Sequence, residues 1–311
     1  MIIHLGYVSI SKTLDITPSK TLTYTEFNKH KDFNKLNNII IENLNNLEKI
    51  IDYNIKNNIH FYRLTSKLIP LASLKKVNFD YIKKYKEQYK RIGNKINKYN
   101  IRVDTHPDQF CILNSTKKEI VENSINILKY HYNILKALNI KNKIIILHIG
   151  SSVFGKDNSI KRFINNFNKL PKYLQKCIAI ENDDKIYNIK DCLYLCETLN
   201  IPMVLDYHHH ICNNDNLNIL DYLNQIFYTW KITPKIHFSS PKNKTKRDFR
   251  SHHDYINISD FISFLELIKS LNINLDIMLE CKAKDEALFK LVRQLKYYDY
   301  NFIDETTIKL K

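Results

Sequence analysis

Carboxylate and imidazole side chains recur directly after apolar runs in this chain of 311 residues. The apolar run 177–180 is followed by Glu181, and the run 203–205 is followed by Asp206 and then His209. An amphipathic stretch separates the two runs and predicts a helix, so the runs should be parallel strands whose carboxyl ends are neighbours. Because converging carboxylates and imidazoles are the ligands of divalent metal ions, this arrangement predicts a metal site.

The same pattern recurs at other predicted strand ends. The further candidate ligands are His106, His148, His237, His252 and Glu280. Burying so many ionisable groups without partners would cost several kcal/mol each, so we predict a cluster of two or three divalent ions bridged by Glu181. Such a cluster suits phosphate-ester cleavage, because the ions clamp phosphate oxygens and lower the pKa of a bound water.

Four of these strand-end positions are our candidates for catalysis, namely Glu181, Lys235, His237 and Glu280. Lys235 lies two positions before His237 and should point to the same side of its strand. It could hold a phosphate, serve as an extra anionic ligand if it were carboxylated, or be a plain solvated lysine.

Eight apolar runs predict the strands that position these groups. They cover residues 2–10, 61–64, 101–103, 144–147, 177–180, 203–205, 235–238 and 277–279. Segments with helical spacing lie between them, for example 121–135, 189–199 and 261–271. Since no linker or change of composition interrupts the series, we expect residues 1–311 to form one domain, a closed (β/α)8 TIM barrel rather than an open doubly wound sheet.

The composition narrows the class of partner. The chain has 48 Lys and Arg against 32 Asp and Glu, a net charge of +16 that favours a polyanionic partner. No run has the length and purity of a membrane span, and the first ten residues do not resemble a signal peptide. We therefore expect an intracellular protein with no membrane association.

Seven motifs at the predicted strand ends resemble those of the UV damage endonucleases. They are HPDQFCILNS (106–115), LHIGSSVFGK (147–156), IENDDKIY (180–187), LDYHHH (205–210), KIHFSS (235–240), HHDYI (252–256) and DIMLECKAKDEAL (276–288). The resemblance covers nearly the whole chain. It implies a barrel of the endonuclease IV and xylose isomerase type that nicks damaged double-stranded DNA immediately 5′ of cyclobutane dimers, 6-4 photoproducts and some abasic sites.

The resemblance also implies roles for particular residues. The eight strand-end residues would be the metal ligands, with Mn²⁺ as our first expectation and Zn²⁺, Co²⁺ or Mg²⁺ also compatible with the ligands. Gln109 and Phe110 would wedge into the duplex opposite the extruded lesion. Phe110 stands where relatives usually have tyrosine, and Leu74 stands where they usually have histidine, which would remove a metal or phosphate contact.

Further DNA contacts are predicted from position. Tyr7, at the end of the first strand, could stack on a flipped base or be an ordinary tyrosine of the barrel mouth. The basic run 242–250 lies between two predicted ligands, so Lys244, Lys246 and Arg247 are candidates for phosphate contacts, with a solvated loop as the alternative.

Three other functions remain open at this point. A general abasic-site endonuclease of the endonuclease IV type would share the site. A sugar isomerase or epimerase with the same barrel would have no need of a net charge of +16. An inactive module that only binds lesions would keep the basic face but lose metal ligands. We expect a monomer.

Overall fold

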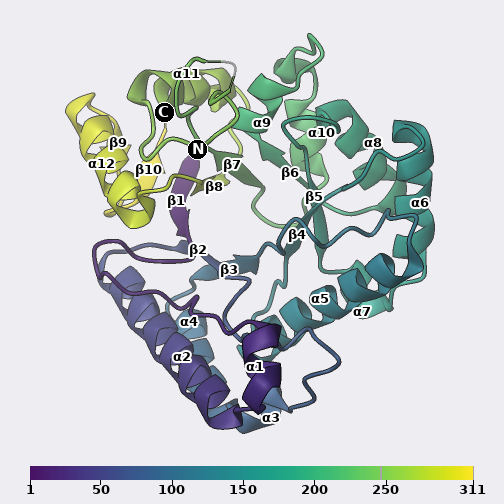
Figure 1. Cartoon of the computed structure of the whole chain (residues 1–311). Coiled ribbons are helices and arrows are strands. Elements are labelled where there is room, and N and C mark those ends of the chain that lie inside the picture. The colour runs from purple at the N-terminus through teal and green to yellow at the C-terminus, as the bar shows by residue number, and fades with distance from the viewer. Residues whose placement is uncertain (246, 311) are drawn as a thin grey trace.

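Parallel strands from the whole length of the chain form a closed barrel in the computed structural model, which describes residues 1–245 and 247–310 (Figure 1). The barrel strands are β1 (Ile2–Val8), β2 (Phe61–Leu64), β3 (Arg102–Thr105), β4 (Ile145–His148), β5 (Ile178–Glu181), β6 (Met203–Asp206), β7 (Lys235–Phe238) and β8 (Leu275–Leu279). β1 pairs in parallel with both β8 and β2, so the sheet closes on itself. The predicted TIM barrel is confirmed.

The seam between β1 and β2 depends on Gly6. This residue is in register with Phe61, and a Cβ atom at position 6 would collide with the Phe61 carbonyl oxygen. Any side chain here would therefore push the two strands apart where the barrel closes.

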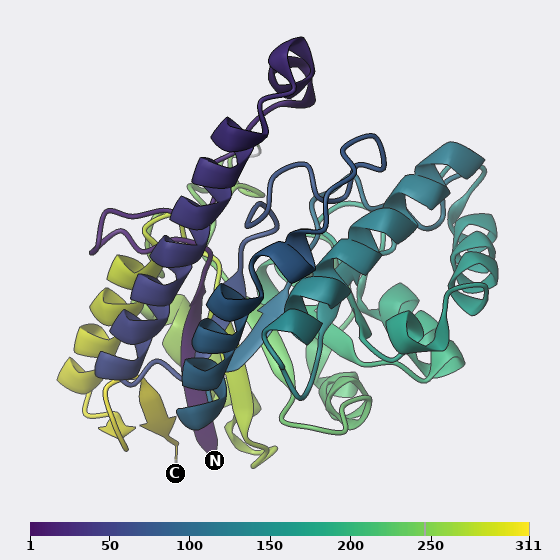
Figure 2. The same cartoon turned by 90° about the horizontal axis from the view of Figure 1, so that it is seen from below.

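Helices cover the outside of the barrel (Figures 1 and 2). They are α1 (Tyr24–His30), α2 (Phe33–Lys56), α3 (Tyr81–Lys84), α4 (Lys86–Lys98), α5 (Lys118–Ala137), α6 (Lys156–Asn168), α7 (Lys172–Gln175), α8 (Ile189–Leu199), α9 (Tyr207–Cys212), α10 (Leu223–Tyr228), α11 (Ile258–Lys269) and α12 (Lys284–Tyr297), with the 3₁₀ turn η1 (Ile219–Asp221) before α10. The predicted helix 189–199 coincides with α8, and 121–135 lies within α5. Among the described residues, no helix is both long and apolar enough to cross a membrane.

Two short strands near the carboxyl terminus were not predicted. β9 (Asn301–Phe302) and β10 (Thr307–Lys309) are antiparallel, and β10 pairs with the first residues of β1. β2 pairs only with Gly6 to Val8, so β10 occupies the part of this edge of β1 that β2 leaves free. With two and three residues, these strands contain no apolar run long enough to be recognised.

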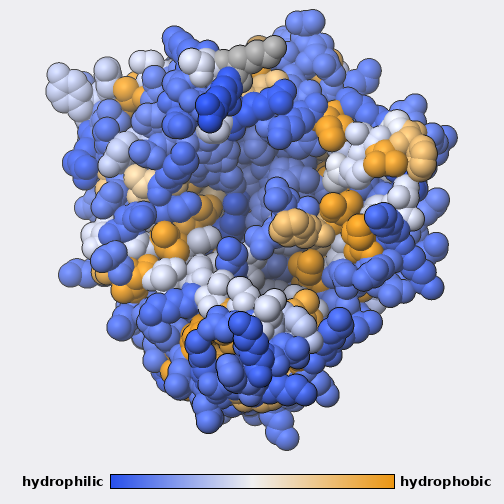
Figure 3. Space-filling model, viewed as in Figure 1, coloured by the Kyte–Doolittle hydropathy of each residue, from blue (hydrophilic) through white to orange (hydrophobic). Residues whose placement is uncertain are grey.

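The carboxyl ends of the strands form the mouth of the barrel, which faces the viewer in Figure 1. Figure 3, seen from the same side, shows a central hollow lined mainly by hydrophilic residues. In Figure 2, α1 and the first turns of α2 project beyond the mouth on one side. The polar strand ends therefore lie in a recess that is open to a large partner.

Candidate metal centre

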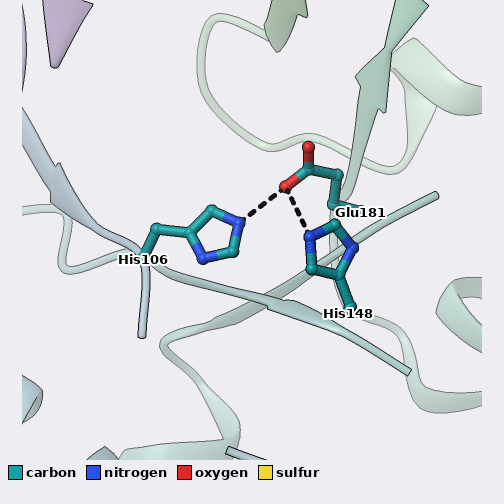
Figure 4. Close-up of side chains that lie close together, drawn as sticks. All are labelled: His106, His148 and Glu181. Atoms are coloured by element: carbon teal, nitrogen blue, oxygen red, sulfur yellow. Dashed lines mark hydrogen bonds and ion pairs between the residues drawn. The ribbon is translucent and has the colours of Figure 1, made fainter. Parts of the chain in front are cut away.

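Glu181, the last residue of β5, lies at the centre of the polar cluster and is 1% exposed. One carboxylate oxygen, Oε2, lies 2.9 Å from Nε2 of His106 and 3.8 Å from Nε2 of His148 (Figure 4). The other oxygen, Oε1, lies 2.8 Å from Nδ1 of His237. Glu181 thus uses both oxygens to join imidazoles that come from three different strand ends.

The strand register explains why these groups meet. His148 is paired with Glu181 across β4 and β5, and Asp206 is paired with His237 across β6 and β7. Asp206 is also the N-cap of α9, and its carboxylate accepts a hydrogen bond of 2.8 Å from the backbone N–H of His209. The cap turns the chain sharply at the end of β6 and brings His209 back over the mouth.

Two groups of potential ligands share Glu181. In each group the candidate ligand atoms all lie within 4.8 Å of one another. The first group is His106, His148 and Glu181, and the second is Glu181, Asp206, His237 and Glu280. A carboxylate common to two such groups has the position required of a bridge between two ions.

The remaining predicted ligands border the second group. Nδ1 of His209 lies 3.6 Å from Glu181 Oε1 and 3.7 Å from Asp206 Oδ2. Nδ1 of His252 lies 2.8 Å from the backbone oxygen of Glu280 and 4.0 Å from its carboxylate. The structure therefore brings all eight predicted ligands to one place.

The donor set and its burial fit divalent ions. Asp206 is fully buried, and its Oδ2 atom has no hydrogen-bond partner among the described residues. Burial raises the pKa of Asp206 to about 8, and the carboxylates of Glu181 and Glu280 add to the effect, although His209 opposes it. Imidazole and carboxylate ligands around an unsatisfied buried carboxylate suit Mn²⁺, Zn²⁺, Co²⁺ or Mg²⁺, so these residues could hold such ions.

Arg63 on β2 belongs to this site and was not predicted. Its guanidinium places Nη1 2.6 Å from Oε1 of Glu280 and Nη2 2.5 Å from Nε2 of His237. Burial alone would raise the pKa of Glu280, but Arg63 and His237 outweigh it and hold the pKa well below the ordinary value. The available signal was a single arginine within the apolar run FYRL (61–64), which a buried strand tolerates only with a partner.

Two predicted contact residues, Lys235 and Tyr7, are buried, which contradicts a phosphate contact by the first and base stacking by the second. Lys235 is 0% exposed and its Nζ lies 2.5 Å from Oδ2 of Asp104, so the ammonium is already paired below the mouth and does not reach a phosphate. Burial lowers the pKa of Lys235 to about 7. Tyr7 is also 0% exposed and donates a hydrogen bond of 2.8 Å to Asn54 of α2, so its ring cannot stack on a base.

Gln109 and Phe110 lie at the rim of the mouth, in the loop after β3. Gln109 lines a cavity of about 280 Å³ together with His106 and His148. Phe110 is 70% exposed and lines a second cavity of about 320 Å³ beside it. The pair therefore lies at the edge of the cavity that the first ligand group lines, where a wedge could enter a duplex.

The basic run 242–250 lies in the loop that follows β7. Pro241 and His252 are bridged, and the Lys242 N–H donates to the Ser251 carbonyl oxygen at 2.7 Å, so both ends are tied. Lys244 and Arg247 are exposed within it, whereas Lys246 lies outside the described residues. The exposed cations are thus tethered beside the predicted ligand His252.

Leu74 lies in the loop between β2 and α3. It is 41% exposed, and its N–H donates to the Leu71 carbonyl oxygen at 3.0 Å. Both ligand groups are assembled without this position. A leucine here is consequently compatible with the Glu181-centred site.

Known sequences resemble this chain over nearly its whole length. The family model described as UV-endonuclease UvdE matches residues 3–310. The UV DNA damage endonuclease of Bacillus mycoides (strain KBAB4) is 41% identical over 303 residues, and that of Bacillus cereus (strain G9842) is 40% identical over 303 residues. Each alignment covers 95% of this chain and 95% of the relative.

The structure of this chain is also similar to solved structures. The crystal structure of SacUVDE superposes with a TM-score of 0.88 at 35% identity, covering 96% of this chain and 99% of the other. Endonuclease IV from Thermus thermophilus shares the fold, with a TM-score of 0.59, 10% identity and coverage of 94% and 99%. On the family match, the identities and the superposition together, the chain belongs to the UvdE family of UV-endonucleases.

Proposed function

We propose that this chain is a DNA repair endonuclease that nicks double-stranded DNA immediately 5′ of UV photoproducts, both cyclobutane dimers and 6-4 photoproducts, and of some abasic sites. The observation that carries the proposal is the position of Glu181, which joins two ligand groups in an open recess of a chain from an endonuclease family. Work on DNA would place the enzyme inside the cell, and we expect it to act as a monomer.

The two ligand groups would hold two or three divalent ions, with Mn²⁺ as the first candidate. Bound there, the ions would stabilise charge on the phosphate oxygens and lower the pKa of a bound water. Buried Glu181 and His237, with the partly buried Glu280, form the floor of the site. Their mutual contacts, together with Arg63, fix the orientation of each ligand atom before DNA arrives.

The rim of the site would receive the scissile phosphate. The side chains of His106 and His148 are 15% and 32% exposed, so their rings border the open recess. The ring of His209 lies beside that of His148, with 5.8 Å between the ring centroids. Burial lowers the pKa of His209, but Asp206 and Glu181 outweigh that effect and raise the pKa to about 9. In the metal-free protein it is therefore an imidazolium that attracts an anionic phosphate.

Gln109 and Phe110 would recognise damage through the gap that a poorly stacked nucleotide leaves. The His106-Pro107 dipeptide links them to a ligand through a short, proline-stiffened segment, so the wedge stays close to the scissile phosphate. Extruding a damaged nucleotide costs less than extruding a normal one, so a side chain that fills the vacated space selects several lesions together. The exposed ring of Phe110 can stack on bases without the hydroxyl of a tyrosine.

Lys244 and Arg247 would contact the phosphate backbone on either side of the lesion. Both are exposed in the loop that precedes His252. Lys246 belongs to the same basic run in the sequence. Contacts of this kind fix the register of the protein on DNA and carry no sequence information. They would strengthen binding to damaged and undamaged duplex equally.

A nicking assay tests the proposal. Supercoiled plasmid, either UV-irradiated, depurinated or untreated, is incubated with the purified protein, with and without a chelator. We expect conversion of irradiated plasmid to the nicked form only when metal is present, with cleavage mapped to the phosphodiester 5′ of the lesion. Cleavage of depurinated plasmid alone would instead identify a general abasic-site endonuclease, and no cleavage of either would refute the proposal.

A further inference from the structure

Val153 and Phe154 form an exposed apolar pair beside the metal centre. They lie in the loop 149–155, which follows His148 at the end of β4, and are 48% and 75% exposed. Phe154 is held at φ +65°, in the left-handed region that disfavours side chains with a Cβ atom. A large apolar residue that is both exposed and strained adds little to the core and suggests a role in contact with a partner.

The backbone of this pair is firmly held. Arg162 Nη2 and Ser159 Oγ donate to the Val153 carbonyl oxygen at 2.5 and 3.1 Å, and Asn158 Nδ2 donates to the Phe154 carbonyl oxygen at 2.9 Å. All three donors come from α6. Because both carbonyl groups are fixed to the helix, the backbone that carries the two side chains is already ordered, which reduces the entropy lost on binding.

The loop also forms one wall of the active-site recess. Ser151 lines the cavity of about 280 Å³ that Gln109 and His148 line. Three residues of extended chain span at most about 11 Å, so the Phe154 Cα lies within that distance of the Ser151 Cα. This distance corresponds to about three base-pair steps of 3.4 Å.

We propose that Val153 and Phe154 are a second apolar contact to duplex DNA, which stacks on a base or enters a base step a few base pairs from the cleaved phosphodiester. The proposal rests on the proposed endonuclease function. DNA is the occupant that fits, because the pair continues the face that holds the metal centre and the chain carries a net charge of +16. Apolar side chains that contact base steps beside cations are a common means of holding deformed DNA.

The role of this pair differs from that of Gln109 and Phe110. An aromatic ring can stack on any base, so the contact of Phe154 with DNA does not require a lesion. Phe154 should therefore strengthen binding to undamaged and damaged duplex to a similar extent. Phe110, which would fill the gap left by the lesion, should act mainly on damaged duplex.

The substitution Phe154→Gly tests this inference, because glycine removes the ring and also relieves the strain at φ +65°. Binding is measured by fluorescence anisotropy with an undamaged duplex and with a duplex that carries one cyclobutane dimer and a non-hydrolysable linkage 5′ of it. We expect Kd to rise about five- to tenfold for both duplexes, while Tm stays unchanged or rises. Phe154→Tyr, which keeps the ring, should bind as the wild type does.

The matched control is Tyr228→Ala. Tyr228 ends α10, before β7 begins, at the opposite end of the barrel from the mouth, and it is 80% exposed. Its removal should leave both affinities unchanged. Affinities of Phe154→Gly within twofold of the wild type, or a fall in Tm that accompanies the loss of affinity, would overturn the inference. A wild-type protein that binds neither duplex would instead overturn the endonuclease function, and this contact with it.

Discussion

Replacing Glu181 by glutamine removes the charge shared by the two ligand groups while it preserves the size of the side chain. Oε1 lies 2.8 Å from an imidazole nitrogen of His237, and Oε2 lies 2.9 Å from one of His106. A glutamine amide has one acceptor oxygen, so its NH2 group would face the second imidazole. Losing one charge-assisted hydrogen bond costs about 1.5–3 kcal/mol, and two cations would also lose their common anionic ligand.

We therefore expect nicking of irradiated plasmid by Glu181→Gln to fall at least ~10²-fold, which corresponds to about 2.7 kcal/mol of transition-state stabilisation. Metal content, measured by elemental analysis of the purified protein, should fall as well, while circular dichroism shows a folded barrel. Glu197→Gln is the control, because Glu197 is exposed on α8 and undergoes the same chemical change. Nicking by Glu181→Gln at near the wild-type rate would refute the multi-metal hypothesis.

Four further predictions concern the surroundings of this residue. Phe110→Ala should weaken binding to duplexes with a dimer or an abasic site by about 1–3 kcal/mol per lost stacking contact, with unchanged metal content; an equal loss for undamaged duplex would argue against a wedge. Lys244→Ala combined with Arg247→Ala should weaken binding to all duplexes and reduce the salt slope by about one unit per lost phosphate contact, whereas an unchanged slope would identify a solvated loop. Arg63→Met leaves buried carboxylates unpaired and should lower the stability of the metal-free protein by about 3–5 kcal/mol; a smaller loss of Tm in the presence of Mn²⁺ is expected, because the ions supply positive charge. Burial raises the pKa of Asp206 to about 8, against about 3.9 in an unfolded chain, so the Asp206 carboxyl group should cost the metal-free protein more stability as the pH rises from about 4 to about 8; the Tm of Asp206→Asn should therefore exceed that of the wild type by an amount that grows with pH, and a difference in Tm that does not change across this range would contradict the reasoning.

Much of the fold could be predicted because its strands are short apolar runs separated by amphipathic helices. The limits of the strands were less certain. β4 extends to His148 and β5 to Glu181, one residue beyond each apolar run, because backbone pairing between these two residues continues whatever their side chains are. The apolar pattern marks where side chains are buried, whereas a strand ends where its backbone ladder ends.

The ligands could be predicted because a barrel collects strand ends at one face. The solvent exposure of individual side chains near the mouth could not be predicted in the same way. Tyr7 and Lys235 both lie on strands that lead to the mouth, yet Asn54 of α2 takes the hydroxyl of the first and Asp104 of β3 pairs with the ammonium of the second. Asn54 and Asp104 are both distant in the sequence from the residues they contact. No local sequence pattern therefore indicates that they bury Tyr7 and Lys235.

The buried charged groups below the mouth explain how the barrel accommodates the two ligand groups. Lys235 and Asp104 neutralise each other, which leaves one guanidinium, that of Arg63, beside the carboxylates of the two ligand groups. Among the described residues, Arg63 and the His209 imidazolium lie beside the carboxylates of the second ligand group, while Asp206, whose pKa is raised to about 8, holds a proton at neutral pH. Burying so many ionisable groups is costly in a protein interior, and the closed hydrogen-bonded sheet prevents the strands from separating to relieve that cost. Divalent cations would take the place of the protons on Asp206 and His209, so the rigid frame offers them carboxylate and imidazole ligands that are already in position.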